Sequence, residues 1–180
     1  SDMAILAERG TSVVHNAASN MKLGNGFADV PALLAHGVNV CLGTDSAASN
    51  NSLNMLREME LVSLIHKGTH RDATAVSAVQ VFDMATKNGA RAVGLGGKTG
   101  EIRVGLRADL ALFDMGSVGF FPVGDPKAAL CYSSAGLRAD TVLVNGEILL
   151  KHGEFKTIDA ARVKYEIGRL DERLQKGIKA

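Results

Sequence analysis

Strand-like apolar runs alternate with helix-like segments at the beginning of the chain, and this alternation restricts the fold more than any other feature. The sequence predicts a helix over 3–9, a strand over 11–15, a helix over 29–37 and a second strand over 38–43. Pro31 lies in the first turn of the second helix, where its missing N–H does no harm. This order is typical of a parallel α/β sheet with right-handed crossovers.

The segments around and after these strands are predicted from the same kind of pattern. Polar residues over 16–26 indicate a loop, and apolar side chains at helical spacing predict helices over 53–67 and 73–88. The first half of the chain is therefore expected to be a layer of parallel strands covered by helices.

The pattern changes from Gly94 onward, where glycines separate short alternating runs. Strands are predicted over 101–104, 109–113, 141–144 and 147–150, and a charged helix from about Asp159. Asn145-Gly146 between the last two runs is the strongest short hairpin signal in the sequence. We therefore expect two parts, residues 1–93 and residues 94–180, with the second mostly antiparallel β.

Composition excludes several classes of protein. With 46% hydrophobic and 22% charged residues, the chain is typical of a soluble globular protein. A net charge of +1 gives no reason to expect binding to nucleic acid or to an anionic membrane. The apolar runs are shorter than the roughly 20 residues of a membrane span. Cys41 and Cys131 lie in strand-like runs without CxxC spacing, so two buried free thiols and a cytoplasmic location are expected.

One carboxylate stands where α/β proteins place their active sites. Asp45, in Gly43-Thr44-Asp45-Ser46, follows the C-terminal end of the second predicted strand. There it could ligate a metal ion or take a proton from a metal-bound water. It could also simply cap the next helix, and for these four residues alone capping is the commoner role.

A second polar segment follows the first predicted strand. It runs from His15 to Asn20. Because His15 stands at a strand end, it could be a ligand, a proton shuttle or only a hydrogen-bonded side chain. The remaining histidines show no HxH or HExxH spacing, and no complete zinc site is visible.

Several segments together carry a resemblance to a known family. They are SVVHNAASNMKLGNG, DVPALLAHG, VNVCLGTDSAASNNSLNMLREM, ATKNGARAVGL, TGEIRVGLRADLALFD and DPKAALCYSSAGLRADTVLVNGEILLKHGEF. In order and spacing they resemble the amidohydrolase superfamily, in its metal-dependent chlorohydrolase and aminohydrolase branch of triazine hydrolases and adenosine-type or guanine-type deaminases.

The resemblance implies an α/β fold and an enzymatic role. Residues 1–93 would form the last two β/α units of a (β/α)8 TIM-type barrel, and residues 94–180 the C-terminal part of a composite β-sandwich. Asp45 would bind one divalent metal ion, zinc or iron, and accept a proton from the attacking water. That water would displace an amino or halide group from a small heterocyclic substrate, purine- or triazine-like, with His15, Asn20 and Ser46 lining the pocket.

The chain departs from the family pattern at two points. Ala17 replaces the proline of the family's HNP-type motif. The family's other metal-binding histidines would lie before Ser1, so this chain is expected to be the C-terminal portion of a hydrolase, to hold no metal alone and to be inactive by itself. Two strands cannot close a barrel, so self-association through exposed barrel edges is expected.

Two other interpretations remain open. The chain could be a stand-alone, non-catalytic β-rich module for binding or assembly, or it could be one chain of a split hydrolase. An upstream segment that supplies the HxH pair, within the same reading frame or in a separate gene, would distinguish them.

Overall fold

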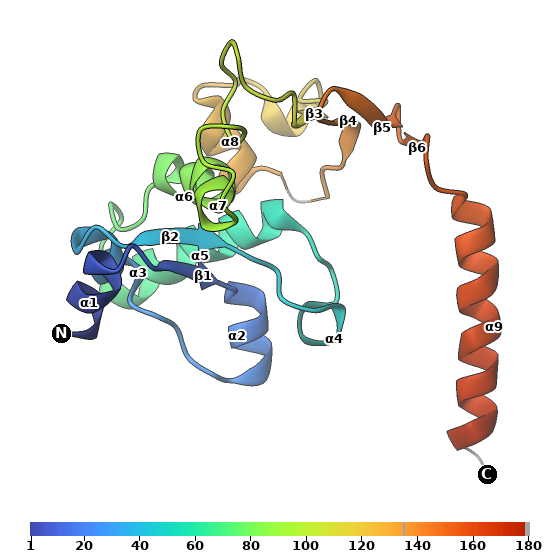
Figure 1. Cartoon of the computed structure of the whole chain (residues 1–180), viewed down its shortest axis with the longest axis horizontal. Coiled ribbons are helices and arrows are strands. Elements are labelled where there is room, and N and C mark those ends of the chain that lie inside the picture. The colour runs from blue at the N-terminus through green and yellow to red at the C-terminus, as the bar shows by residue number, and fades with distance from the viewer. Residues whose placement is uncertain (135, 179–180) are drawn as a thin grey trace. The chain divides into compact units, whose positions relative to one another are not determined.

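The chain forms two compact units in a computed structural model that describes residues 1–134 and 136–178. The first unit comprises Ser1–Arg107 and Met115–Leu137, and the second comprises Ala108–Asp114 and Arg138–Ala180. Both α-helices and β-strands are present, so the fold is mixed α/β as expected (Figure 1). The division into barrel residues 1–93 and sandwich residues 94–180 concerns a larger architecture and stays a prediction.

The first unit contains most of the helices and one pair of strands. Its elements are α1 (Asp2–Glu8), β1 (Ser12–His15), α2 (Ala17–Leu23), α3 (Val30–Ala35), β2 (Asn39–Leu42), α4 (Ala47–Asn50), α5 (Met55–His70), α6 (Ala78–Ala85), α7 (Lys87–Ala92), η1 (Val118–Phe120) and α8 (Pro126–Tyr132). Strands β1 and β2 pair in parallel, from Ser12 opposite Asn39 to His15 opposite Leu42. The predicted helix–strand–helix–strand order and its parallel pairing are confirmed.

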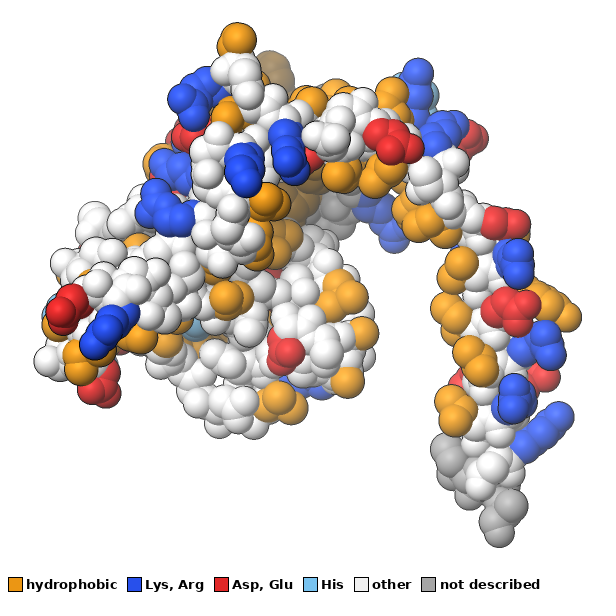
Figure 2. All heavy atoms as spheres, viewed as in Figure 1, with side chains coloured by type: hydrophobic (Ala, Val, Ile, Leu, Met, Phe, Trp, Pro, Cys, Tyr) orange, Lys and Arg blue, Asp and Glu red, His pale blue; other side chains and the backbone are white. Residues whose placement is uncertain are grey.

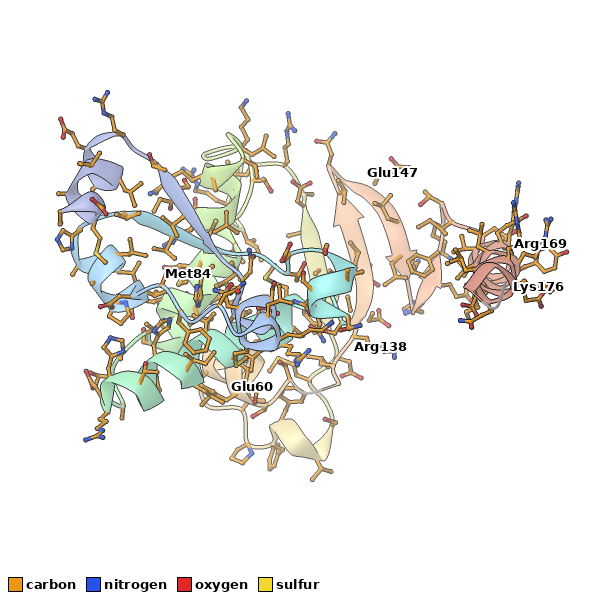
Figure 3. All side chains as sticks on the ribbon, turned by 90° about the horizontal axis from the view of Figure 1, so that it is seen from below. Glu60, Met84, Arg138, Glu147, Arg169 and Lys176 are labelled. Atoms are coloured by element: carbon orange, nitrogen blue, oxygen red, sulfur yellow. The ribbon has the colours of Figure 1, made fainter. Side chains whose placement is uncertain are left out.

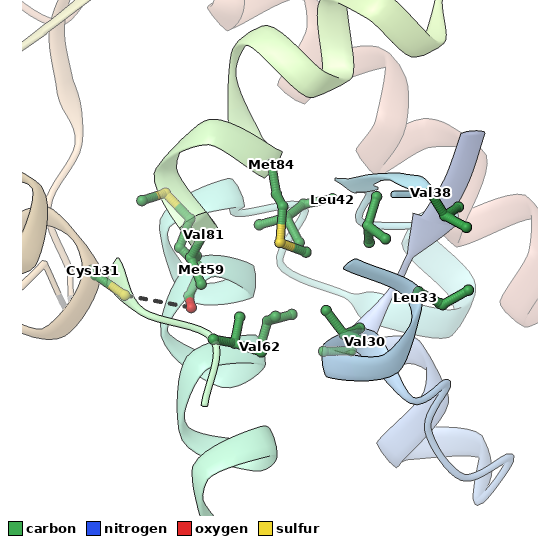
Figure 4. Packing of buried hydrophobic residues seen from close by; sticks show 12 residues of the cluster. Val30, Leu33, Val38, Leu42, Met59, Val62, Val81, Met84 and Cys131 are labelled. Atoms are coloured by element: carbon green, nitrogen blue, oxygen red, sulfur yellow. Dashed lines mark hydrogen bonds between the residues drawn. The ribbon is translucent and has the colours of Figure 1, made fainter. Parts of the chain in front are cut away.

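The core of the first unit is built from aliphatic side chains and the two buried methionines Met59 and Met84. Met84 on α6 is fully buried and packs with a cluster drawn from α3, β2, α5 and α8 (Figure 4). The thiol of Cys131 donates a weak hydrogen bond to the carbonyl oxygen of Met59 at 3.6 Å. Both cysteines are buried and free, as predicted, and burial raises the pKa of each thiol.

Four predictions for this unit were wrong in detail. Residues 16–26 contain helix α2, which ends at Gly24 in the left-handed conformation. The helix predicted over 73–88 begins only at a capping box made by Ser77 and Gln80 and is interrupted at Thr86, between α6 and α7. Residues 101–104 form bends and turns rather than a strand. Cys131 lies on helix α8, not on a strand.

The second unit is a four-stranded antiparallel sheet followed by a long helix. Its elements are β3 (Leu110–Phe113), β4 (Ala139–Val144), β5 (Glu147–Lys151), β6 (Glu154–Phe155) and α9 (Ala160–Ile178), and the strand order is β3-β4-β5-β6. Asn145 and Gly146 both have positive φ, 50° and 83°, as a two-residue hairpin turn of the mirror-image type requires. The predicted hairpin and terminal helix are confirmed.

Helix α9 has an apolar and a charged side. Hydrophobic side chains run along its length beside a row of basic ones (Figure 2), and Arg169 and Lys176 extend from it (Figure 3). Within residues 1–134 and 136–178, no helix is long and apolar enough to cross a lipid bilayer.

Candidate active site

Asp45 lies directly after β2, in the turn that leads into α4. Its φ of 60° is left-handed, a conformation that aspartate adopts more readily than most residues other than glycine. Gly43, the residue directly after β2, is equally constrained, because a Cβ atom there would overlap Oδ1 of Asn16 and lie 2.7 Å from Cγ1 of Val14. Few residue types therefore fit the backbone at positions 43 and 45.

Three hydrogen bonds hold the Asp45 carboxylate. The hydroxyl groups of Ser19 and Ser49 both donate to Oδ2, each at 2.7 Å, and the backbone N–H of Ser46 donates to Oδ1 at 2.8 Å. These bonds, that of Ser19 first, lower the pKa of Asp45 below its ordinary value, against a smaller opposing effect of burial. Asp45 is exposed, and its carboxylate is held ionised at neutral pH.

One acceptor position of the carboxylate remains for a ligand. An ionised carboxylate offers about four lone-pair sites, and the described residues use two on Oδ2 and one on Oδ1. The remaining site, on Oδ1, can take one metal ion, and a proton can occupy a site on Oδ2 if one serine hydroxyl turns away. The chemistry of Asp45 therefore fits a single metal–ligand bond.

The described residues do not complete a metal centre. Within residues 1–134 and 136–178, no group of three or more His, Cys, Asp or Glu side chains is arranged to hold an ion. Structural and catalytic zinc sites need three or four protein ligands. Asp45 can therefore contribute one ligand to a site whose other ligands come from elsewhere.

Ser46 lies beside Asp45 and shares its network. It is the N-cap residue of α4, and its hydroxyl lies 3.2 Å from that of Ser49. Ser46 and Asp45 are neighbours in the sequence, so their closeness does not test the predicted site. Their proposed roles, metal and proton binding for Asp45 and substrate binding for Ser46, stay predictions.

His15 and Asn20 take different positions. His15 is 2% exposed, its ring centroid lies 5.4 Å from that of His66, and its Nε2 has no protein partner among the described residues. Burial lowers its pKa. Asn20 is partly buried on α2, directly after Ser19. No hydrogen bond of the described residues joins either side chain to Asp45, and their assignment to a substrate pocket also stays a prediction.

Sequence reasoning missed the serine pair, although a signal was present. The tetrapeptide Ala-Ala-Ser-Asn occurs twice, at 17–20 and at 47–50, just after each parallel strand. Its serines, Ser19 and Ser49, are the two hydroxyl donors to Asp45. Because parallel strands end at the same edge, a repeat at both strand ends brings like residues together.

A family model matches most of the chain. The model described as the amidohydrolase family matches residues 1–149. This chain belongs to the amidohydrolase family. Among curated amidohydrolases, a 5-methylthioadenosine/S-adenosylhomocysteine deaminase from Acetivibrio thermocellus is 48% identical over 173 residues, which cover 96% of this chain and 40% of that protein. A protein of the same name from Moorella thermoacetica is 45% identical over 176 residues, covering 98% of this chain and 40% of its own.

Solved amidohydrolase structures agree with the fold. An adenosine deaminase from Xanthomonas campestris with bound zinc superposes with a TM-score of 0.91 at 34% identity, covering 97% of this chain and 40% of that one. An atrazine chlorohydrolase from Arthrobacter aurescens complexed with zinc gives 0.85 at 27% identity, with 94% and 38% covered. The chain therefore spans about two fifths of the length of these relatives. The predicted resemblance to the aminohydrolase and chlorohydrolase branch is confirmed.

Proposed function

We propose that this chain is the C-terminal portion of a metal-dependent hydrolase that removes an amino group from a purine-type heterocycle. The observation that carries the proposal is the carboxylate of Asp45, presented after a parallel strand and held by three hydrogen bonds with one acceptor position left. Relatives named 5-methylthioadenosine/S-adenosylhomocysteine deaminase favour deamination over removal of a halide.

In this proposal the two predicted parts of the chain, whose bounds differ from those of the two compact units, belong to a larger architecture. Residues 1–93 supply the last two β/α units of a TIM-type barrel, and residues 94–180 supply part of a β-sandwich. The parallel pairing of β1 and β2 and the antiparallel sheet of β3 to β6 support these assignments.

The residues of this chain have defined parts in the reaction. Asp45 supplies one ligand to a zinc or iron ion, whose chemistry when bound is to activate a water molecule. Asp45 also accepts one proton from the attacking water, whose oxygen bonds to the ring carbon. Asp45 then gives this proton to the amino group, which leaves as ammonia, and the second water proton stays on the adjacent ring nitrogen. Ser19 and Ser49 hold the Asp45 carboxylate in place, and Ser46, Asn20 and His15 contact the substrate.

The proposal also predicts the metal binding and activity of the 180-residue chain by itself. Residues 1–134 and 136–178 offer Asp45 as a single ligand, whereas a zinc site needs three or four. The 180-residue chain alone should therefore neither retain zinc nor turn over substrate. A chain extended upstream to the length of its relatives should do both.

The test uses this extended chain. Asp45→Asn keeps the shape and tolerates the left-handed backbone but removes the charge, so ammonia release from 5-methylthioadenosine and S-adenosylhomocysteine should fall to background. Asp171→Asn, the same change on exposed helix α9, should leave turnover unchanged. Normal ammonia release by Asp45→Asn would refute the role of Asp45, and chloride release from atrazine without ammonia release would refute the choice of deamination.

A further inference from the structure

A buried carboxylate joins helices α2 and α4, which both contact Asp45. Glu58, on α5, is completely buried. Its Oε2 accepts a hydrogen bond from the backbone N–H of Ala18 at 3.1 Å, and its Oε1 accepts one from Nδ2 of Asn50 at 2.8 Å. Ala18 and Asn50 belong to the two Ala-Ala-Ser-Asn segments, so one side chain holds both of them.

Asn50 carries this link to the end of strand β2. The Nδ2 atom that donates to Glu58 also donates to the carbonyl oxygen of Thr44 at 2.7 Å. Thr44 directly precedes Asp45. The Oδ1 atom of Asn50 in turn accepts a hydrogen bond from the hydroxyl of Ser52 at 3.2 Å. The amide of Asn50 is therefore fixed on both sides, and through it Glu58 restrains the backbone that presents Asp45.

Glu58 also replaces a local helix cap. Asn16, the N-cap residue of α2, makes no side-chain cap hydrogen bond. The first turn of a helix leaves N–H groups without intrahelical partners. The N–H group of Ala18 is one of them, and its acceptor is the Glu58 carboxylate, 40 residues away. Ser19, the next residue, then points its hydroxyl at Asp45. Burying a carboxylate is costly unless it is hydrogen-bonded, and the donors Ala18 and Asn50 meet this condition for Glu58.

We infer that Glu58 is a positioning residue for the amidohydrolase site. It holds Ser19 on α2 and Ser49 on α4 so that both hydroxyl groups reach the same oxygen of Asp45. The geometric part of this inference stands on the contacts alone, and only its consequence for turnover rests on the proposed function of Asp45.

The test compares two charge-removing variants of the same helix by NMR of the ¹⁵N-labelled chain. Glu58→Gln keeps the volume but turns an NH₂ group toward one of two donors, so one hydrogen bond is lost. We expect the amide signals of Ala18, Thr44 and Asp45 to move, and the Ala18 amide to exchange with solvent at least about tenfold faster, as the loss of a charge-assisted hydrogen bond implies. Glu60→Gln (Glu60 is labelled in Figure 3) should leave these signals unchanged.

A second variant separates positioning from capping. Asn50→Ala keeps the bond between Glu58 and Ala18 but cuts the link to Thr44, so Thr44 and Asp45 should shift while Ala18 exchange stays slow. If the Asp45 signals stay in place in both variants, Glu58 only caps α2 and the inference is wrong. If Glu58→Gln does not fold, the Asp45 signals of Asn50→Ala alone test the inference: movement supports it, and no movement refutes it.

Failure of this inference is distinguishable from failure of the proposed function. The NMR signals of Asp45 report its placement whether or not the extended chain has activity. Retained turnover by Asp45→Asn would refute the function and leave the positioning result untouched. Unmoved Asp45 signals would refute the positioning role and leave the function standing.

Discussion

The hydroxyl of Ser19 lies 2.7 Å from Oδ2 of Asp45, although 26 residues separate them in the sequence. The bond connects helix α2, which follows β1, to the segment after β2, and it is the largest contribution to the lowered pKa of Asp45. The charge state of Asp45, a candidate metal ligand, therefore depends on how the ends of β1 and β2 are placed relative to each other.

Removal of this hydroxyl should raise the pKa of Asp45. In Ser19→Ala the carboxylate loses its strongest donor, and its pKa should move toward the ordinary value, measured by a ¹³C-carboxyl NMR titration. Since the folded pKa lies below the unfolded one, this bond stabilises the protein at neutral pH, and the contribution is lost as pH falls through the folded pKa. Ser117→Ala, at an exposed N-cap without a side-chain cap bond, should not change the titration. Identical curves for the two variants would contradict this prediction.

A methyl group at position 43 should disturb the same turn. In Gly43→Ala the new Cβ atom would overlap the Asn16 side chain and lie 2.7 Å from Val14 Cγ1, so the free energy of unfolding in urea should fall by about 1–3 kcal/mol. Gly68→Ala is the matched control, because a Cβ atom there has nothing within 4 Å inside helix α5. The control should increase stability by about 0.5–1 kcal/mol, and a loss in both variants would rule out the steric explanation.

Acid should destabilise the first unit through its buried histidines. Desolvation, with His15 and His70 nearby, lowers the pKa of His66 from 6.5 to about 4, against a smaller opposing effect of Asp29. The unfolded chain therefore binds the proton first, so the stabilisation is complete above pH 6.5 and lost as pH falls toward 4. The loss, on the order of 3 kcal/mol from this residue, is measurable by urea unfolding at several pH values.

A variant of His66 isolates its share of the pH dependence. His66→Leu removes both ring nitrogens, which have no hydrogen-bond partner among the described residues, and should flatten the dependence between pH 6.5 and 4. His36→Gln changes an exposed histidine at the end of α3 and should leave the slope as it is. An unchanged slope in His66→Leu would show that other groups control acid unfolding.

The chain should associate with itself in solution. In the described residues β1 and β2 pair only with each other, and Val14 on β1 is 52% exposed. Open strand edges with apolar side chains favour pairing between chains, so sedimentation should give a mass that rises with concentration. Val14→Lys should lower this mass, whereas Val104→Lys, in a fully exposed turn, should not. A concentration-independent monomer would refute the prediction.

Periodic segments allowed much of the fold to be predicted from sequence. Helix α5, strands β1 and β2 and the hairpin at Asn145-Gly146 follow from side-chain spacing and turn chemistry, which are local properties. Helix α2 was missed because Ser19 and Asn20 are residue types typical of turns. The acceptor that satisfies its Ala18 N–H lies on α5. Residues 101–104 alternate like a strand, yet Val104 is fully exposed, because alternation does not supply a partner strand.

The site was predictable only in part, for a similar reason. Asp45 follows a buried strand, and that position can be found from sequence. Its donors Ser19 and Ser49 could have been found from the repeated tetrapeptide, whereas Glu58 appears in the sequence as one more acidic residue of a helix. Its burial and its two donors depend on the tertiary packing of α2, α4 and α5.

The two sheets differ in how far apart along the chain their partners lie, and this difference sets an order of folding. Ser12 and Asn39, opposite each other in the parallel pair, are 27 residues apart. Val144 and Glu147 of the hairpin are nearly adjacent. Hairpins close within about 1–10 μs, while non-local pairings must first overcome the entropy of a long loop. We therefore expect hydrogen exchange during refolding to protect β4 and β5 before β1 and β2, so that the turn bearing Asp45 is among the last parts to take shape.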